Sequence, residues 1–393
     1  MRILIHALAV KKHGGMARHL TNFIPALGKY GSSHQYIIYV DKDFPLPPIP
    51  PNVTICQETV RAASQRVLWD VSRWPKIAQV HQVDAIWNLL GFGALNPPVP
   101  QIMFQRVPGY YCRYYLEAVD TKTRWQAYLR RWWQAAIMRK SAHIITPTGA
   151  MRDMIRFHHS DLPLNRFSVL PHAYNPLALE GELPANILVR FSTLPSEAIK
   201  LLYVGHILPY KDLDFVLDVF AAATQKSHAP LYWFLTIGRQ DWPEGYDAFV
   251  EKVRHLGLEQ QVIILGKLPG ASIGGLYRAC DLVLFPSLCE SFGWPMLEAT
   301  SLAKPLFIAD TPLNREMTGA GGVYYKIGDK HSAVDSLFSL LSSPDKLQEK
   351  GQLGYRHFVQ THVTWERYIN RCHTITEQTL KSDTVVTTIP HSL

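Results

Sequence analysis

The sequence predicts an α/β protein of two domains, each with a parallel sheet covered by helices. Short apolar or β-branched runs alternate along the whole chain with longer stretches that have helical spacing. Runs this apolar are typical of strands buried on both faces, as in parallel sheets. At 393 residues the chain is too long for one ordinary hydrophobic core and suits two.

The expected strands form two series with a pause between them. The first series comprises residues 3–9, 36–40, 53–56, 85–90, 102–105, 143–147 and 168–170. The second comprises residues 201–204, 233–237, 262–265, 282–286, 306–309 and 323–326. Between them the alternation stops, and the segment is interrupted by Pro176, Gly181, Pro184 and Pro195. We therefore expect domains at residues 1–180 and 199–364, a linker at 181–198, a last helix at 365–380 and a frayed polar tail at 381–393.

Composition narrows the class of protein and its partners. The chain is 47% hydrophobic and 18% charged, which is typical of a folded globular protein. No apolar run reaches the roughly 18 residues of a membrane span, and the N-terminus lacks the features of a signal peptide, so we expect a cytoplasmic protein. The five cysteines have no CxxC spacing, which argues against disulfides and a zinc site. The net charge of +8 indicates a phosphate-bearing substrate, an acidic membrane or nucleic acid, and the absence of nucleic-acid-binding motifs disfavours the last.

A glycine pair follows the first expected strand. Within residues 11–16, Gly14 and Gly15 let the backbone approach a ligand, and the next helix presents free N–H groups at its start. Pro25 is expected to kink or end the second turn of this helix. The side chains that would hold the helix on the sheet are spaced at i, i+3, i+4 and i+7, namely Leu20, Phe23, Ile24 and Leu27. Two glycines after a strand also fit a simple tight turn.

The first strand of the second series is followed by a loop that carries a lysine. Gly205 and His206 begin this loop, and Lys211 and Asp212 end it. Asp212 suits the N-cap of the following helix, which would place the Lys211 ammonium beside a phosphate held over the helix end. A solvated lysine on a surface loop is the alternative.

Two glutamates that enclose seven residues form the most specific pattern. An expected strand ends at Pro286, Glu290 lies on the loop after it, and Glu298 lies in the helix that Pro295 starts. A carboxylate only accepts hydrogen bonds, which suits the paired hydroxyls of a ribose or a hexose. The helix N-terminus beside them offers positive potential for a diphosphate. A sugar nucleotide carries all three groups.

This segment resembles the E-x7-E signature of the retaining glycosyltransferase family 4, a group 1 glycosyltransferase family with the GT-B fold. The resemblance covers most of the chain, because the Gly14-Gly15 loop, the lysine loop, residues 310–316 and Trp365 follow in the family's order. It implies two Rossmann-like domains whose parallel sheets face a cleft, with the C-terminal helix returning to the N-terminal domain. It also implies retaining transfer of a hexose from a GDP- or UDP-sugar to a glycan or lipid-linked acceptor, in cell-surface polysaccharide or glycolipid synthesis.

The resemblance implies roles for the residues at matching positions. Lys211 would contact the donor diphosphate, Glu290 the hydroxyls of the donor sugar, and Glu298 the ribose. Gly14 and Gly15 would line the acceptor side from the N-terminal domain. Further contacts to the donor are expected from Gly205, Lys267, Leu268, Ser291, Phe292 and Gly293.

Two positions depart from the family's pattern. Where the family usually has an arginine after the glycine, this chain has His206, and a histidine loses its charge near neutral pH. Where the family often has a histidine in the N-terminal domain, this chain has Gln105 and Arg106. We assign His206 and Arg106 to the catalytic set with Lys211 and Glu290, because positive groups stabilise charge on the leaving diphosphate. In the mechanism proposed for the family a donor phosphate oxygen takes the acceptor proton, so we expect neither a cofactor nor a metal.

Other patterns support competing interpretations. Residues 270–274 match the G-x-S-x-G motif of serine hydrolases, with Ser272 as the nucleophile, although residues 267–269 separate it from the preceding strand. A sugar-nucleotide or glycan-binding module without catalytic activity is a third class. Residues 41–43 and 212–214 match the DxD pattern of metal-dependent transferases, but their places at a strand end and a helix cap favour structural roles.

Residues 124–140 predict a basic, tryptophan-rich helix. Such a helix would rest on an anionic bilayer and collect a lipid-linked acceptor. Alternatively, it packs on the N-terminal sheet and keeps its basic residues in water.

Overall fold

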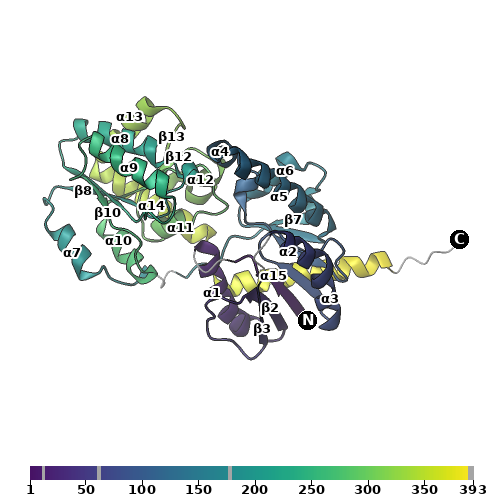
Figure 1. The fold of residues 1–393 in the computed structure, drawn as a ribbon. Coiled ribbons are helices and arrows are strands. Elements are labelled where there is room, and N and C mark those ends of the chain that lie inside the picture. Colours follow the sequence, from purple (N-terminus) through teal and green to yellow (C-terminus); the bar gives the residue numbers. More distant parts are fainter. Residues whose placement is uncertain (11–13, 60–62, 176–178, 388–393) are drawn as a thin grey trace. The chain divides into compact units, whose positions relative to one another are not determined.

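The computed structural model describes residues 1–10, 14–59, 63–175 and 179–387 (Figure 1). The chain divides into two compact units. Unit 1 comprises Met1–Cys112, Asp120–Tyr174 and Val363–Leu393, and unit 2 comprises Arg113–Val119 and Asn175–His362. Both units are α/β, and all thirteen expected strands are confirmed with ends that differ by at most a few residues.

Unit 1 is built on a seven-stranded parallel sheet with the order β3-β2-β1-β4-β5-β6-β7. Its strands are β1 (Arg2–His6), β2 (Gln35–Asp41), β3 (Val53–Glu58), β4 (Ala85–Asn88), β5 (Gln101–Phe104), β6 (His143–Thr146) and β7 (Phe167–Val169). The order reverses beside β1, since Ile5 aligns with Ile38 of β2 on one side and with Trp87 of β4 on the other. In parallel sheets, ligands bind beyond the carboxyl ends of the strands at such a reversal.

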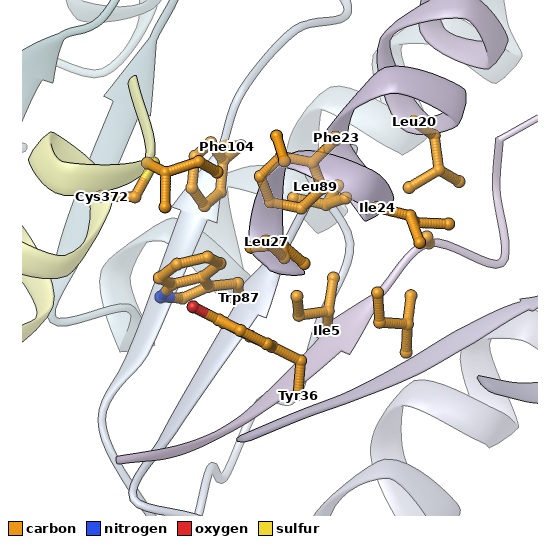
Figure 2. Packing of buried hydrophobic residues seen from close by; sticks show 14 of the residues in the cluster. Ile5, Leu20, Phe23, Ile24, Leu27, Tyr36, Trp87, Leu89, Phe104 and Cys372 are labelled. Atoms are coloured by element: carbon orange, nitrogen blue, oxygen red, sulfur yellow. The ribbon is translucent and has the colours of Figure 1, made fainter. Parts of the chain in front are cut away.

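Helices cover this sheet. They are α1 (Gly15–Tyr30), α2 (Ala63–Leu68), the π-helix η1 (Trp69–Arg73), α3 (Trp74–Val80), η2 (Pro108–Tyr110), α5 (Thr121–Lys140), α6 (Gly149–His158), η3 (Leu164–Arg166) and α15 (Trp365–Thr387). Figure 2 shows that the predicted apolar face of α1 packs against the strands, with Phe23 and Leu27 close to Trp87. Pro25 does not end α1, which continues to Tyr30. Pro25 has no N–H group to donate to the carbonyl of Thr21, four residues before it, and Thr21 is exposed.

The terminal helix α15 packs on unit 1, as expected. Cys372 of α15 lies in the same core as α1 (Figure 2). Two polar contacts fix the packing, because the Trp87 indole donates to Thr376 Oγ1 at 2.9 Å and the Tyr36 hydroxyl lies 2.7 Å from His373 Nε2. The helix continues beyond the expected end at residue 380 as far as Thr387, and residues 388–393 of the expected tail lie outside the described residues.

Unit 2 is built on a six-stranded parallel sheet with the order β10-β9-β8-β11-β12-β13. Its strands are β8 (Ile199–Tyr203), β9 (Leu231–Leu235), β10 (Val262–Ile264), β11 (Leu282–Phe285), β12 (Leu306–Ala309) and β13 (Gly322–Tyr325). Here the order reverses beside β8, which has β9 on one side and β11 on the other. Among the described residues, no helix combines the length and the apolarity that a bilayer span requires.

The helices of unit 2 include one that the sequence did not predict. They are α4 (Arg113–Ala118), α7 (Ala185–Ser192), η5 (Pro209–Lys211), α8 (Leu213–Lys226), α9 (Pro243–His255), η6 (Gly270–Ser272), α10 (Ile273–Ala279), α11 (Trp294–Ser301), α12 (Pro312–Thr318), η7 (Gly319–Gly321), α13 (Lys330–Leu341) and α14 (Pro344–Thr361). The segment expected as a linker at 181–198 contains α7. It is also tied to unit 2, because the Arg278 guanidinium donates to Leu179 O and Gly181 O at 2.6 Å each.

Candidate functional site

The loops that follow β8, β9, β10 and β11 carry the charged groups of the candidate site in unit 2. These strands are neighbours, and in a parallel sheet their carboxyl ends lie at one edge. The reversal beside β8 is therefore the place where a ligand is expected, and two of the residues that the sequence singled out meet there.

Lys211 and Glu290 form an ion pair that joins the β8 loop to the β11 loop. Their side chains are only 12% and 18% exposed. Glu290 Oε1 also accepts from Ser287 Oγ at 2.9 Å, whereas Oε2 has no hydrogen-bond partner among the described residues. One carboxylate oxygen is thus fixed by the protein while the other remains available to a ligand.

The two loops of this pair are held together by backbone contacts. The N–H group of Leu288 donates to Tyr210 O at 3.0 Å. The amide of Asn314, on α12, donates to Ser287 O at 3.2 Å. The positions of Lys211 and Glu290 are therefore set by the scaffold and do not depend on a surface ion pair alone.

The expected N-cap role of Asp212 is wrong. Asp212 adopts a left-handed conformation with φ 50°, and its side chain makes no cap hydrogen bond. Burial and the neighbouring Asp214 raise the pKa of Asp212 to about 6. Asp212 lies between η5, which ends at Lys211, and α8, which begins at Leu213.

A second cluster joins the loops after β8, β9 and β10. Asp241 Oδ1 lies 2.7 Å from His206 Nδ1 and 2.6 Å from Lys267 Nζ. The Asp241 side chain is 3% exposed, while those of His206 and Lys267 are about half exposed. Burial alone would raise the pKa of Asp241, but hydrogen bonds from Lys267 and His206 outweigh burial and lower it. Asp241 thus holds the side chains of His206 and Lys267, and both remain partly exposed to solvent.

Tyr203 lies between the two clusters. Its hydroxyl donates to His206 O at 2.8 Å, and burial together with the charges of Glu290 and Asp241 raises its pKa. The N–H group of Gly205 donates to Thr236 Oγ1 at 3.1 Å, which fixes the start of the lysine loop against the end of β9. Two hydrogen bonds therefore fix the start of the loop, where Gly205 and His206 lie.

The second glutamate of the E-x7-E pattern has a different environment. Glu298 lies in α11, is 3% exposed, and accepts from the Tyr277 hydroxyl at 3.1 Å. Gly293 precedes α11 with φ 82°, a conformation that favours glycine. Phe292 is buried, and Ser291 is half-buried. Leu268 is half-buried, three residues after Leu265, which follows β10.

The remaining predicted residues belong to unit 1. Arg106 follows β5 and is 6% exposed, and Gly14 precedes α1 with φ 101°. Gly15 is the first residue of α1. Lys11, Lys12 and His13 of the predicted glycine-rich segment lie outside the described residues.

The structure does not support a serine hydrolase. Ser272 ends the 3-10 helix η6 in an ordinary right-handed conformation and is 7% exposed. Five residues lie between the end of β10 at Ile264 and η6 at Gly270, so the sharp strand-to-helix turn of a nucleophile elbow is absent there. No group of three or more acidic, histidine or cysteine residues suited to a metal occurs among the described residues.

Sequence reasoning missed Asp241, Tyr203 and Tyr277. Asp241 lies on the loop after β9, and a charged residue at the carboxyl end of a predicted parallel strand was the available signal. Tyr203 and Tyr277 have the apolar surroundings of core residues in the sequence, and only the fold shows their hydroxyls reaching His206 O and Glu298.

The charged and acceptor groups at the edge of the unit 2 sheet indicate which kind of ligand they would bind. Lys211 and Lys267 supply positive charge, His206 supplies an imidazole, and Glu290 and Glu298 supply acceptor groups. Cations bind phosphate oxygens and carboxylates bind sugar hydroxyls. The edge of the unit 2 sheet therefore combines the groups that would bind a molecule with both phosphates and hydroxyls.

Comparisons with known proteins agree with this fold. The family model of glycosyl transferases group 1 matches residues 187–357, and that of Glycosyltransferase Family 4 matches residues 13–176. D-inositol 3-phosphate glycosyltransferase from Segniliparus rotundus is 31% identical over 178 residues, which cover 42% of this chain and 36% of that protein. The aligned part thus spans little more than a third of that relative's length.

Solved structures resemble the whole chain. Sucrose-phosphate synthase from Thermosynechococcus elongatus superposes with a TM-score of 0.74 at 15% identity, covering 97% of this chain and 99% of that one. Anabaena HepE, solved with UDP and glucose, has a TM-score of 0.70 at 16% identity, covering 96% and 99%. The matches of both family models, taken with the two parallel-sheet units, show that the chain belongs to the group 1 glycosyltransferases of GT-B fold.

Proposed function

We propose that the chain transfers a hexose from a UDP- or GDP-sugar to a glycan or lipid-linked acceptor, with retention of anomeric configuration, in cell-surface polysaccharide or glycolipid synthesis. The observation that carries the proposal is the Lys211–Glu290 pair at the reversal of the unit 2 sheet. A cation and a carboxylate in contact suit a ligand in which a phosphate and a sugar hydroxyl lie close together, as at the sugar end of a sugar nucleotide.

The residues of unit 2 would divide the donor between them. Lys211 would move from Glu290 toward the diphosphate, and Glu290 would accept from hydroxyls of the sugar through Oε2. Glu298, fixed by Tyr277, would accept from the ribose hydroxyls. His206 would lie beside the diphosphate, with Asp241 holding its Nδ1 so that Nε2 is left for the ligand.

Charge stabilisation would be the main catalytic contribution of the protein. As the bond from the sugar to the phosphate breaks, negative charge accumulates on the leaving diphosphate, and Lys211 and His206 would stabilise it. A phosphate oxygen of the donor would take the acceptor proton on the same face of the sugar, which gives retention. No protein base is required in this scheme.

Binding of donor candidates tests the proposal. We expect calorimetry with UDP-, GDP- and ADP-sugars to select one nucleotide, and Lys211→Ala and Glu298→Ala to weaken its binding by about 10- to 100-fold, as for loss of hydrogen bonds to charged groups. Arg239→Ala, which removes an exposed ion pair with Asp247, is the matched control and should bind as the wild type does. Binding without turnover in acceptor screens would favour a non-catalytic sugar-nucleotide-binding protein, and no binding by the wild type would reject the proposal.

Helix α5 supports the further proposal that the protein contacts an anionic membrane. Trp125, Leu129 and Trp132, spaced at i, i+4 and i+7, are 64%, 66% and 68% exposed. The helix has no acidic residue, and its basic residues are Lys122, Arg124, Arg130, Arg131, Arg139 and Lys140. A stripe of exposed tryptophan and leucine with basic residues around it is typical of a helix that lies in a bilayer interface.

Vesicle sedimentation tests this contact. We expect the wild type to sediment with vesicles that contain phosphatidylglycerol and not with phosphatidylcholine alone. Replacing Trp125 and Trp132 by Ser should abolish sedimentation, whereas Leu188→Ser with Val189→Ser, which removes exposed apolar side chains from α7, should not. Equal loss in both double variants would show that general surface hydrophobicity causes the binding.

A further inference from the structure

The guanidinium of Arg106 in unit 1 is buried without a counter-charge. Arg106 is 6% exposed, and its Nη2 donates to the Tyr368 hydroxyl at 2.5 Å. Its other contacts are Met16 Sδ at 3.8 Å and the ring of Phe104 at 5.0 Å. No carboxylate among the described residues pairs with it. A buried charge is costly unless it is paired, and a phenol, a thioether and a ring compensate it only in part.

The histidines around Arg106 do not supply the missing charge. His19 and His172 are 1% and 3% exposed, and their rings lie 4.7 Å apart. Burial lowers the pKa of both, and the positive charge of Arg106 lowers them further, so both rings are neutral. Neither ring nitrogen of His19 has a hydrogen-bond partner among the described residues. The cluster therefore keeps a net positive charge and carries unused polar groups.

A helix N-terminus adds positive potential beside Arg106. Met16, which contacts the guanidinium, lies in the first turn of α1. This turn has no acidic residue, and Gly14 before it provides no side-chain cap. A side chain built on Gly14 would meet no atom within 4 Å among the described residues other than its chain neighbours. Unsatisfied N–H groups and the helix dipole both attract anions there.

The position in the fold also indicates a ligand. Arg106 follows β5 and α1 follows β1, with β4 between these two strands, so both lie at the carboxyl edge where the unit 1 sheet reverses. We propose that Arg106 and the N-terminus of α1 bind an anionic group of the acceptor, a phosphate monoester or a carboxylate. This inference rests on the proposed function only in treating the ligand as the acceptor. It gives Arg106 an acceptor-binding role in place of contact with the leaving diphosphate.

Two kinds of acceptor would present such an anionic group to Arg106. One is a soluble sugar or cyclitol phosphate, and the other is the headgroup of an anionic glycolipid or phospholipid.

Paired probes test the site without requiring catalysis. Calorimetry would compare glucose 6-phosphate, inositol 3-phosphate and glucuronate with glucose and inositol, and vesicles containing phosphatidylinositol would represent the lipid source. We expect the wild type to bind at least one anionic probe about 10- to 100-fold more tightly than its neutral counterpart, and Arg106→Gln to abolish the difference. Arg106→Lys should keep part of it. Arg152→Gln on α6 is the matched control and should retain it.

Two further measurements separate this site from the donor site and from a structural role. Lys211→Ala should weaken binding of the nucleotide sugar about 10- to 100-fold but leave binding of the anionic probe unchanged, and Arg106→Gln should do the reverse. Arg106→Met should leave the melting temperature unchanged or raise it, because it removes a buried charge without a counter-charge. The inference is wrong if the wild type prefers no anionic probe, if Arg106→Gln leaves the preference intact, or if Arg106→Met lowers the melting temperature and Arg106→Lys restores it without any probe binding.

Discussion

In unit 2 the cations at the sheet edge pair with carboxylates, whereas in unit 1 the buried guanidinium of Arg106 meets only neutral groups. Lys211 has Glu290, and Lys267 and His206 share Asp241. Arg106 has a phenol on one side and two neutral imidazoles nearby. Both edges lie at the reversal of a parallel sheet, so the difference is one of side chains and not of fold.

The difference fits two kinds of ligand. A sugar nucleotide presents phosphates and hydroxyls together, so its site needs cations and acceptors, and these neutralise each other when the site is empty. A group that is only anionic needs cations alone, and the protein then bears an unpaired charge until the ligand arrives. The predictions below test whether the two edges differ in this way.

The largest effect is expected from separating Lys211 and Glu290. Changing either to Ala removes one ligand contact and leaves the other side chain without its ion-pair partner, so kcat/KM should fall about 10²- to 10³-fold for each. Because both act on one donor, the double variant should fall by less than the product of the two single effects. The measurement is a double-mutant cycle with the donor that the binding panel selects.

Ser287→Ala provides the control for this cycle. It removes one hydrogen bond to Glu290 Oε1 and leaves the ion pair, so it should cost only about 1 kcal/mol. Strictly multiplicative effects of Lys211→Ala and Glu290→Ala would show that the two residues serve separate ligands.

Acid should destabilise unit 1 before unit 2. Burial lowers the pKa of His373 to about 3 and that of His143 to about 4, and it also lowers the pKa of His19 and His172. The unfolded chain binds these protons below about pH 6.5 and the folded chain does not, so stability is complete above that pH and falls as the pH decreases. The loss is roughly 1.4 kcal/mol per pH unit for each histidine that stays neutral.

Unit 2 has a residue with the opposite dependence. The pKa of Asp212 is raised to about 6 by burial and Asp214, so its contribution to the stability of the fold is complete below its ordinary pKa of 3.8 and is lost as the pH rises through 6.

Hydrogen exchange at pH 5 and pH 7.5, corrected for the intrinsic rate, should show acid-induced loss of protection in α1 and α15. His373→Gln should reduce that loss and His331→Gln, at an exposed position of unit 2, should not. If unit 2 lost protection at pH 5 while unit 1 kept it, the predicted difference between the two units would be wrong.

The sheets were predictable from the sequence because strand burial depends on local pattern. Each of the thirteen strands is a short apolar run, and the stripe of α1 appears directly as Leu20, Phe23, Ile24 and Leu27. Helix α7 was not predictable, because prolines at 184 and 195 flank it, and its segment is fixed to unit 2 by Arg278 from a distant part of the chain. Pro25 lies inside α1 and does not end it, so one of the two outcomes predicted for this proline, a kink or an end, is excluded.

Only those residues of the candidate site that belong to a local sequence motif were predictable. Lys211, Glu290 and Glu298 stand out by spacing, and the structure brings the first two into contact. Asp241 contacts His206 and Lys267, which come from other loops, so no local pattern contains the cluster. The charge imbalance at Arg106 depends on which residues do not surround it, and a sequence does not show that.

The smallest effect is expected from replacing His206 by Arg. An arginine carries a permanent charge, whereas the charge of a histidine depends on its protonation. His206 is about half exposed, so a charge there is worth about 1 kcal/mol at most, or up to about fivefold in rate. We expect His206→Arg to change kcat/KM by no more than about fivefold, with His228→Arg on the loop after α8 as the control. A much larger loss would show that His206 acts through its shape or its bond to Asp241. In that case the cations that meet the diphosphate in unit 2 would reduce to Lys211 and Lys267, and the contrast with Arg106 would rest on them alone.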